Sequence, residues 1–205
     1  MQRNYRLTII AMLSSLLFAA CATMPARQKA LNQNLSWAQR QQQLATITAW
    51  QIKGSIGGHT PRQGFSANVV WRQRQDKRYQ ITIFGPLGVG MTRLDGNASA
   101  VTLTNANNQT FSASKPEQLI QQQLGWSLPV SNLYYWIRGL PAPGNVEISK
   151  FDAYHHLIEL KQQGWQINYR QYAGVDGKVD LPVKLSMRYG DLDLRLVISQ
   201  WLINH

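Results

Sequence analysis

Short segments with alternating apolar and polar residues occupy most of this chain, and they restrict its fold more than any other feature. The first begins at Trp50, and apolar side chains recur at every second residue through Ile52 to Ile56. Similar segments follow at 65–72, 79–84, 91–94, 100–104 and 109–113. A period of two is typical of strands with one buried face. Because no helical pattern separates these segments, we predict an antiparallel meander over this part of the chain.

A helical stretch interrupts the strands in the middle of the chain. Pro116 lies in the first turn of a helix predicted over 115–124. A second helix is predicted over 130–138, with Ser131 as its N-cap. Strand patterns then resume near 146–149, 157–162, 166–172, 182–189 and 192–202. An earlier helix is predicted from Ser36 to Thr46, because Gln39 follows Ser36 at the spacing of a capping box.

The order of these elements favours a mainly β domain over residues 36–205. The apolar face of so many short strands has to be covered, and a closed barrel, a sandwich or a sheet curled around helices would each do so. The two mid-chain helices are well placed to plug a curled sheet. We therefore expect an incomplete, curved antiparallel β-barrel with a helical lid or plug around an apolar cavity.

The N-terminus carries the features of an export signal. Arg3 and Arg6 precede an apolar run over 7–20, and Cys21 is the only cysteine of the chain. The run is shorter than the roughly 20 residues of a membrane-spanning helix. The segment before Cys21 resembles the lipobox of a bacterial lipoprotein, although Phe18 stands where leucine is usual. That resemblance implies a signal peptide over 1–20 and lipid attachment at Cys21. An ordinary signal peptide with an incidental cysteine, or an uncleaved anchor, is the alternative.

The polar segment that follows Cys21 contains no strand pattern. We expect residues 21–35 to form a lipidated N-terminus and a flexible tether. The formal net charge of +11 suits an anionic lipid surface or an acidic partner. An ordinary solvated surface is the alternative. Export and the dispersed positions of the basic residues argue against nucleic acid as a binding partner.

Patterns that would indicate catalysis are not found in the sequence. Asn68 replaces the second glycine of a nucleophile elbow around Ser66. His155 and His156 would point to opposite faces of an extended chain, where they could not share a metal ion. No phosphate-binding loop is present either. We therefore expect no enzyme activity, no catalytic residues, no metal and no cofactor.

The loop Gly85-Pro86-Leu87-Gly88 combines turn residues with an apolar side chain. Polar residues normally occupy such a tip. Leu87 is therefore predicted to be exposed and to enter a bilayer or a groove of a partner. The alternative is that Leu87 folds back into the core.

Taken together and in this order, several segments resemble the LolB family of outer-membrane lipoprotein receptors. They are the lipobox at Cys21, the helix that contains Trp37, the Gly85–Gly88 loop, and segments 50–54, 65–71, 136–141 and 165–169. The resemblance covers essentially the full chain. The Trp-Ile-Arg-Gly-Leu-Pro sequence at 136–141 and the Pro-Leu-Gly loop are together fairly specific.

The resemblance implies a monomeric receptor that accepts acylated lipoproteins from a soluble periplasmic carrier (LolA-like). It would insert them into the inner leaflet of the outer membrane, where it would itself be anchored on the periplasmic side. The family's exposed loop leucine, important for delivery, corresponds to Leu87. Ala22 is consistent with an outer-membrane location, because Asp at that position is the usual inner-membrane retention signal. A structural subunit of an envelope assembly complex, or a lipid-tethered hydrolase, is the alternative.

The acyl chains of a cargo would need an apolar lining. We hypothesise that this lining includes five strand residues that share alternate positions and one helical tryptophan: Phe65, Val69, Trp71, Ile81, Ile83 and Trp136. The sequence leaves open which face of each strand is concave.

Overall fold

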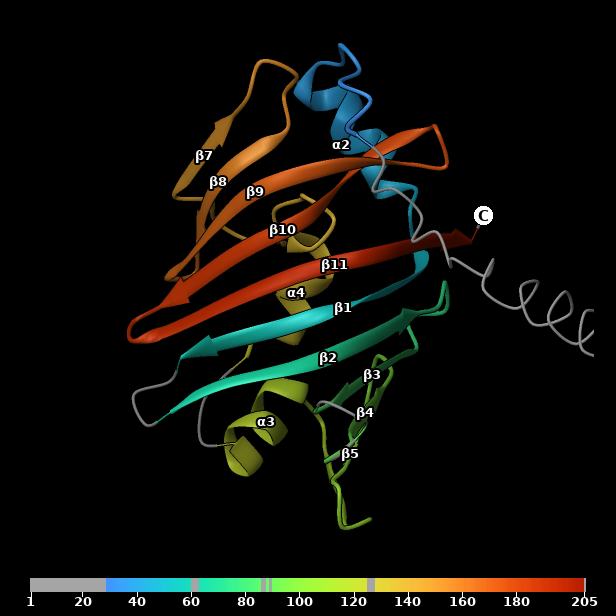
Figure 1. The fold of residues 1–205 in the computed structure, drawn as a ribbon, viewed down its shortest axis with the longest axis vertical. Helices are drawn as coiled ribbons and strands as arrows, with labels where there is room; N and C mark the ends of the chain where they lie inside the picture. Colours follow the sequence, from blue (N-terminus) through green and yellow to red (C-terminus); the bar gives the residue numbers. More distant parts are fainter. Residues whose placement is uncertain (1–28, 60–62, 86–87, 89, 125–127, 205) are drawn as a thin grey trace, which may run out of the picture.

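The computed structural model describes residues 29–204 apart from 60–62, 86–87, 89 and 125–127 (Figure 1). The described strands form one antiparallel sheet in the order β6-β5-β4-β3-β2-β1-β11-β10-β9-β8-β7. Their bounds are β1 (Ala49–His59), β2 (Gly64–Gln73), β3 (Tyr79–Phe84), β4 (Thr92–Gly96), β5 (Val101–Thr104), β6 (Thr110–Ala113), β7 (Ile148–Phe151), β8 (Leu157–Gln162), β9 (Trp165–Val175), β10 (Val179–Tyr189) and β11 (Leu192–Asn204). The helices are α2 (Trp37–Ala45), α3 (Pro116–Leu124) and α4 (Val130–Trp136).

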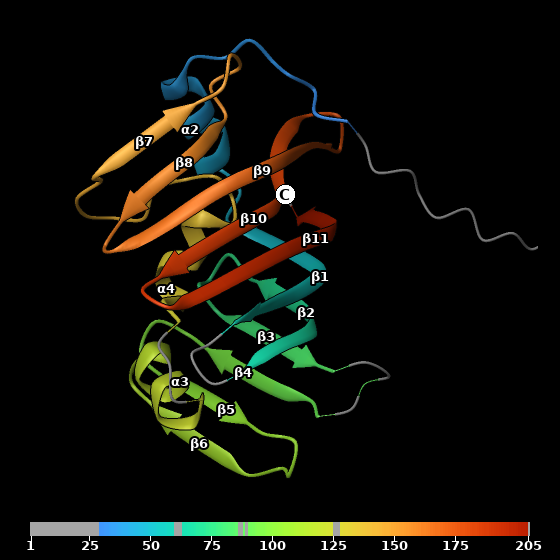
Figure 2. The ribbon, with the colours of Figure 1, turned by 60° about the vertical axis from the view of Figure 1, so that its left-hand side comes forward.

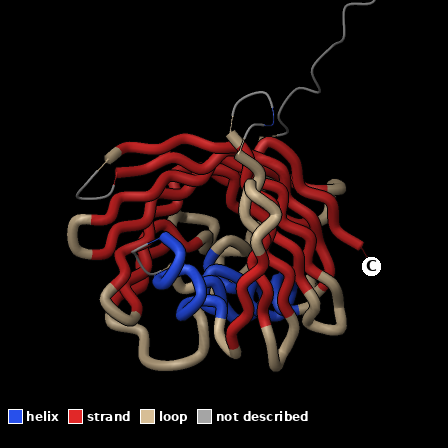
Figure 3. Tube along the Cα trace, turned by 90° about the horizontal axis from the view of Figure 1, so that it is seen from below, coloured by secondary structure: helices blue, strands red, loops and turns tan. Residues whose placement is uncertain are grey.

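The sheet is curved but does not close. Its edge strands, β6 and β7, lie at opposite ends of the strand order, and Figure 2 shows them far apart. Seen along the sheet, the strands form an arch, and the helices lie on its inner side (Figure 3). The expected incomplete, curved antiparallel barrel with helices over its open side is thereby confirmed.

Alternation along the strands separates the two faces of the sheet. In β2, Val69, Trp71 and Gln73 are buried, whereas the intervening Val70 is only partly covered and Arg72 is exposed. The buried set faces the helices, since Trp50 of the neighbouring strand β1 stacks on Tyr134 of α4. The concave face is therefore the one that carries the odd-numbered residues of β2 and β3.

The structure confirms the capping box of α2 but not the predicted N-cap of α4. The capping box of α2 is present, because Ser36 Oγ accepts from Gln39 N–H while the Gln39 side chain accepts from Ser36 N–H. The prediction of Ser131 as N-cap of α4 is wrong: Pro129 occupies that position. The N–H of Ser131 instead donates to Glu117 Oε1 at 3.0 Å. A carboxylate on α3 thus satisfies the start of α4 in place of a local cap.

The hairpin of β9 and β10 extends well beyond its predicted strands. Its additional residues are buried on both faces, so alternation disappears there: Ala173, Gly174, Val175, Val179, Asp180 and Leu181. The covering element is the N-terminal segment, whose Lys29 carbonyl accepts from Gly174 N–H at 3.1 Å. The described part of the expected tether, from Lys29 onward, therefore lies against the body.

Candidate functional site: the concave face of the sheet

An apolar row crosses seven strands on the concave face. Each member lies opposite the next in the strand register, and together they are Phe111, Leu103, Leu94, Ile81, Trp71, Ile52 and Trp201. A parallel row begins with Val69 opposite Ile83. Because cross-strand neighbours on one face are in contact, these rows form one continuous apolar surface.

Five of the six residues hypothesised to line an acyl cavity lie close together on this surface. Val69, Trp71 and Ile81 are buried, whereas Phe65 and Ile83 are half-buried and pack against the same core. Trp136 is in the other half of the molecule. It is fully buried on α4, with its ring 6.0 Å from that of Trp165 on β9.

Aromatic side chains cluster where the row crosses β11, β1 and β2. The ring of Trp50 lies 5.2 Å from that of Trp71 and 5.5 Å from that of Trp201. Trp50 and Trp201 are not among the predicted site residues. The same-face alternation from Trp50 to Ile52 could have identified Trp50, but only the pairing of β1 with β11 reveals Trp201.

The Trp136–Pro141 segment holds α4 against the sheet. Trp136 Nε1 and the backbone N–H of Ala142 both donate to Gln162 Oε1, each at 2.9 Å. Gln162 Nε2 in turn donates to the Ala142 carbonyl at 2.7 Å. Gly139 has a positive φ of 80°, and a Cβ there would lie 3.1 Å from Tyr172 Oη. The Trp136–Pro141 segment therefore fixes the position of α4 on the sheet.

Arg138 joins the ends of two helices. Its guanidinium is buried and donates to the carbonyls of Ile47 at 2.8 Å and Tyr134 at 2.9 Å. It also lies 4.0 Å from the centre of the Tyr134 ring. Burial lowers the pKa of Arg138, which faces carbonyl dipoles and aromatic rings. Its role is therefore to tie the chain after α2 to α4.

Replacing Arg138 with methionine should lower the free energy of unfolding by about 2–4 kcal/mol. Methionine preserves the length of the side chain but leaves buried carbonyls without a donor. Urea unfolding of the two proteins measures the difference. Arg188→Met is the control, because Arg188 is exposed and its guanidinium pairs with Asp193 at the surface. Equal midpoints for Arg138→Met and the parent protein would contradict this role.

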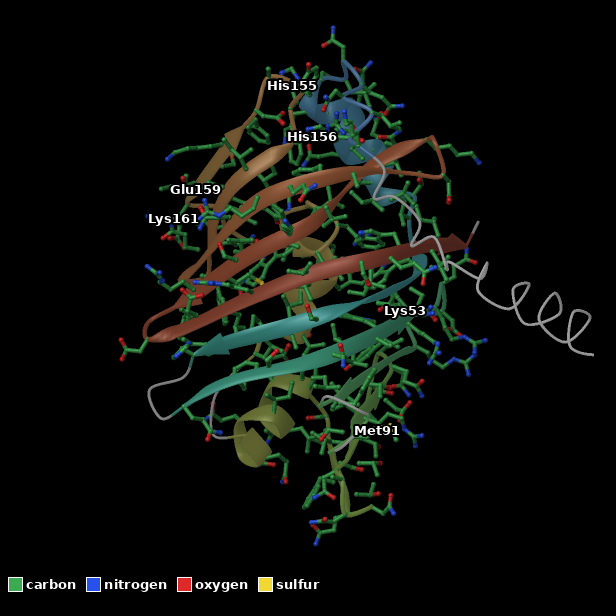
Figure 4. The ribbon with its side chains drawn as sticks, in the orientation of Figure 1. Lys53, Met91, His155, His156, Glu159 and Lys161 are labelled. Atoms are coloured by element: carbon green, nitrogen blue, oxygen red, sulfur yellow. The ribbon has the colours of Figure 1, made fainter. Side chains whose placement is uncertain are left out.

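His156 lies at the centre of a buried polar cluster near α2. Its ring nitrogens lie 2.8 Å from Asp152 Oδ2 and 3.0 Å from Asp180 Oδ2. Asp180 also accepts from the backbone N–H groups of Leu31 and Asn32. His155 has a positive φ and is exposed, and Figure 4 shows the two histidines at the same end of the molecule. The cluster attaches the N-terminal segment to the body.

Within the described residues, no group of three or more His, Cys, Asp or Glu side chains is arranged to hold a metal ion. The same residues include no helix that is long and apolar enough to span a membrane.

The predicted apolar loop is only partly described. Cys21, Pro86 and Leu87 lie outside the described residues, whereas Gly85 and Gly88 lie within them. Gly88 and Gly90 have positive φ, and a Cβ built on either would contact nothing within 4 Å. Met91, the next residue, is 54% exposed and is labelled in Figure 4. Glycine is therefore favoured at these two positions because of the positive φ, and not because a neighbouring side chain leaves no space for a Cβ.

Solved structures with the same fold include a LolA superfamily protein and a DUF1329 family protein. A LolA superfamily protein from Nitrosomonas europaea aligns with a TM-score of 0.53 at 9% identity, covering 81% of this chain and 94% of its own. A DUF1329 family protein from Desulfovibrio piger aligns with a TM-score of 0.58 at 8% identity, covering 82% and 90%. At these identities the likeness establishes the fold alone.

Sequence comparisons identify the family. The family model described as outer membrane lipoprotein LolB matches residues 48–201. An outer-membrane lipoprotein LolB from Coxiella burnetii (strain RSA 493 / Nine Mile phase I) is 41% identical over 198 residues, which are 96% of this chain and 93% of the relative. One from Pseudomonas paraeruginosa is 42% identical over 187 residues, 90% of each chain. This chain therefore belongs to the LolB family of outer-membrane lipoproteins.

Proposed function

We propose that this protein is the outer-membrane receptor that accepts acylated lipoproteins from a soluble periplasmic carrier of the LolA type and inserts them into the inner leaflet. It acts as a monomer held at the membrane by lipid on Cys21. One observation carries the proposal beyond family membership: an open, curved sheet carries a continuous apolar row across seven strands, with the half-buried Phe65 and Ile83 on the same face. That surface suits acyl chains better than it suits a role as a structural subunit of an assembly complex.

The energetics of acyl chains favour a direct handover between similar surfaces. Burial of an acyl chain is worth about 0.8 kcal/mol per methylene, so exposing several chains to water would cost tens of kcal/mol. Passing them from one apolar face to another of the same fold is nearly isoenergetic. The step then needs no nucleotide hydrolysis.

Replacing Ile83 with glutamate tests this proposal. Ile83 is half-buried on the apolar face, opposite Val69. A carboxylate there should abolish uptake of an acylated lipoprotein from the carrier, because an unpaired charge among acyl chains is strongly unfavourable. Transfer is measured by copurification of the lipoprotein with each variant. Thr82→Glu, on the opposite face of the same strand, should retain uptake.

Folding must be confirmed for both variants by circular dichroism and urea unfolding. Undiminished transfer to a folded Ile83→Glu protein would refute the role of this face. Trp71→Glu is a poorer test, because Trp71 is only 4% exposed within the core and a glutamate there would disrupt folding itself.

A further inference from the structure

Among the described residues, three buried hydrogen-bond donors without a partner lie together at one end of the concave face. They are Trp50 Nε1, Trp71 Nε1 and Tyr79 Oη. The Trp50 and Trp71 side chains are almost completely buried, and the Trp71 ring lies 6.4 Å from that of Tyr79. Buried indole N–H and phenol O–H groups normally find an acceptor. Three adjacent exceptions therefore indicate a place where an acceptor binds.

An open pocket of about 770 Å³ adjoins these donors at the ends of β2, β3 and β4. Trp50 and Tyr79 are among its lining residues and Trp71 is not, while Arg72, Arg74 and Arg78 contribute to its rim. The rim arginines already have partners: Arg72 donates to Gln51 and Gln80, and both Arg74 and Arg78 lie beside Asp76. In the part of the chain that the structure describes, the buried groups here that lack a partner are all neutral donors, which favour a neutral acceptor over a phosphate.

The position of the Tyr79 hydroxyl is determined by a glycine on the next strand. Gly96 lies opposite Tyr79 in the register. A Cβ on Gly96 would collide with Cζ and Oη of the Tyr79 ring, so the ring lies directly over the glycine. Burial, reinforced by the charge of Glu117, raises the pKa of the Tyr79 phenol. The hydroxyl consequently remains protonated and available as a donor at physiological pH.

The apolar face extends from these donors for a distance that suits an acyl chain. From Trp71 to Phe65, β2 covers about 20 Å at roughly 3.3 Å per residue. One leaflet of a bilayer holds about 15 Å of hydrocarbon. A chain whose head lies at Trp71 therefore has the length to reach Phe65 along β2, and it would have to displace the side chains that cover Val69 and Trp71.

On the basis of the proposed function, we propose that Trp50, Trp71 and Tyr79 form a polar subsite for the ester carbonyl oxygens of a cargo lipoprotein's diacylglyceryl group. A carbonyl is a neutral acceptor with two lone pairs, which matches three neutral donors in an aromatic setting. The tails then occupy the apolar rows. The subsite determines which end of the face receives the head of the lipid, a property that apolar contacts alone do not supply.

A pair of lipopeptides tests the subsite. One carries two ester-linked acyl chains, and the other carries ether-linked alkyl chains of the same length, which lack the carbonyl oxygens. Binding of each to the full chain is measured by fluorescence anisotropy. Tyr79→Phe removes only the hydroxyl, so it should weaken binding of the ester lipopeptide by about 2- to 10-fold and leave binding of the ether lipopeptide within twofold. Tyr189→Phe, at an exposed tyrosine, is the matched control and should change neither.

The other outcomes are equally decisive. If Tyr79→Phe weakened binding of both lipopeptides equally, Tyr79 would contribute packing only. If it weakened binding of neither, solvent would satisfy the hydroxyl. Either result would overturn the subsite. Gly96→Ala displaces the Tyr79 ring and should reproduce the ester-selective loss, which keeps the test valid if Tyr79→Phe folds poorly. Failure of the parent protein to bind either lipopeptide would instead refute the proposed function.

Discussion

Replacement of Leu87 with glutamate is expected to abolish insertion of cargo into membranes while leaving uptake from the carrier unchanged. An acidic side chain costs about 3 kcal/mol at the centre of a bilayer, where leucine is favourable. The described flanks agree with a loop tip that contacts a membrane. Gly88 and Gly90 stand clear of neighbouring atoms, and Met91 adds an exposed apolar side chain.

Two assays separate the steps for this variant. Copurification with a lipoprotein measures uptake from the carrier, and flotation with liposomes measures incorporation into a membrane. Leu202→Glu is the control, since Leu202 is an exposed leucine on β11, away from the loop. Normal incorporation by the Leu87→Glu protein would show that the loop has no part in delivery. Loss of uptake would instead place Leu87 at the contact with the carrier.

Replacement of Asp180 with asparagine should lower the free energy of unfolding by about 2–3 kcal/mol and release the N-terminal segment. Asp180 is fully buried and accepts from Leu31, Asn32 and His156. An amide removes one acceptor oxygen and introduces donors where donors already converge. Urea unfolding measures the stability, and limited proteolysis between Lys29 and Gln33 measures release of the segment.

Asp176→Asn is the matched control for this prediction. Asp176 lies on the same hairpin but is exposed, and asparagine tolerates its positive φ of 53°. It should leave both readouts unchanged. If Asp180→Asn behaved like this control, the carboxylate would not hold the segment.

The same carboxylate makes stability depend on pH. Burial of Asp180 opposes its ionisation, but hydrogen bonds from His156 and from the backbone of Leu31 and Asn32 outweigh it and lower its pKa below 3.8. Because the folded state has the lower pKa, the stabilisation is complete above pH 3.8 and is lost as the pH falls through the folded value. The difference in stability between the parent protein and Asp180→Asn should shrink over that acidic range.

Much of the fold could be predicted because alternation and turn residues are local signals. The strand pattern that begins at Trp50 and the capping box at Ser36 and Gln39 both depend on neighbours within a few residues. The extension of β9 and β10 could not be predicted, because Gly174 and Asp180 are buried on both sides by a segment distant in sequence. Alternation carries no information where both faces are covered.

The site could be predicted only in part, for a related reason. Residues on adjacent strands of a meander, such as Trp71 and Ile81, are paired by the register and are expected to share a face. The location of Trp136 depends on how α4 packs, and the side chain that fixes it, Gln162, lies on β8. Whether Trp50, Trp71 and Tyr79 find hydrogen-bond partners depends on how the whole core packs, which no local pattern in the sequence encodes.

The pairing of β1 with β11 has a consequence for how the protein is made. The first and last strands meet in the middle of the sheet, and Ser199 Oγ donates to the Lys53 carbonyl across 146 residues of sequence. The two halves of the sheet are thus joined through the pair of β1 and β11. Loop closure over such a distance is slow, and β1 lacks one neighbour until β11 has been made. We therefore expect the two halves of the sheet to remain unjoined until late in folding.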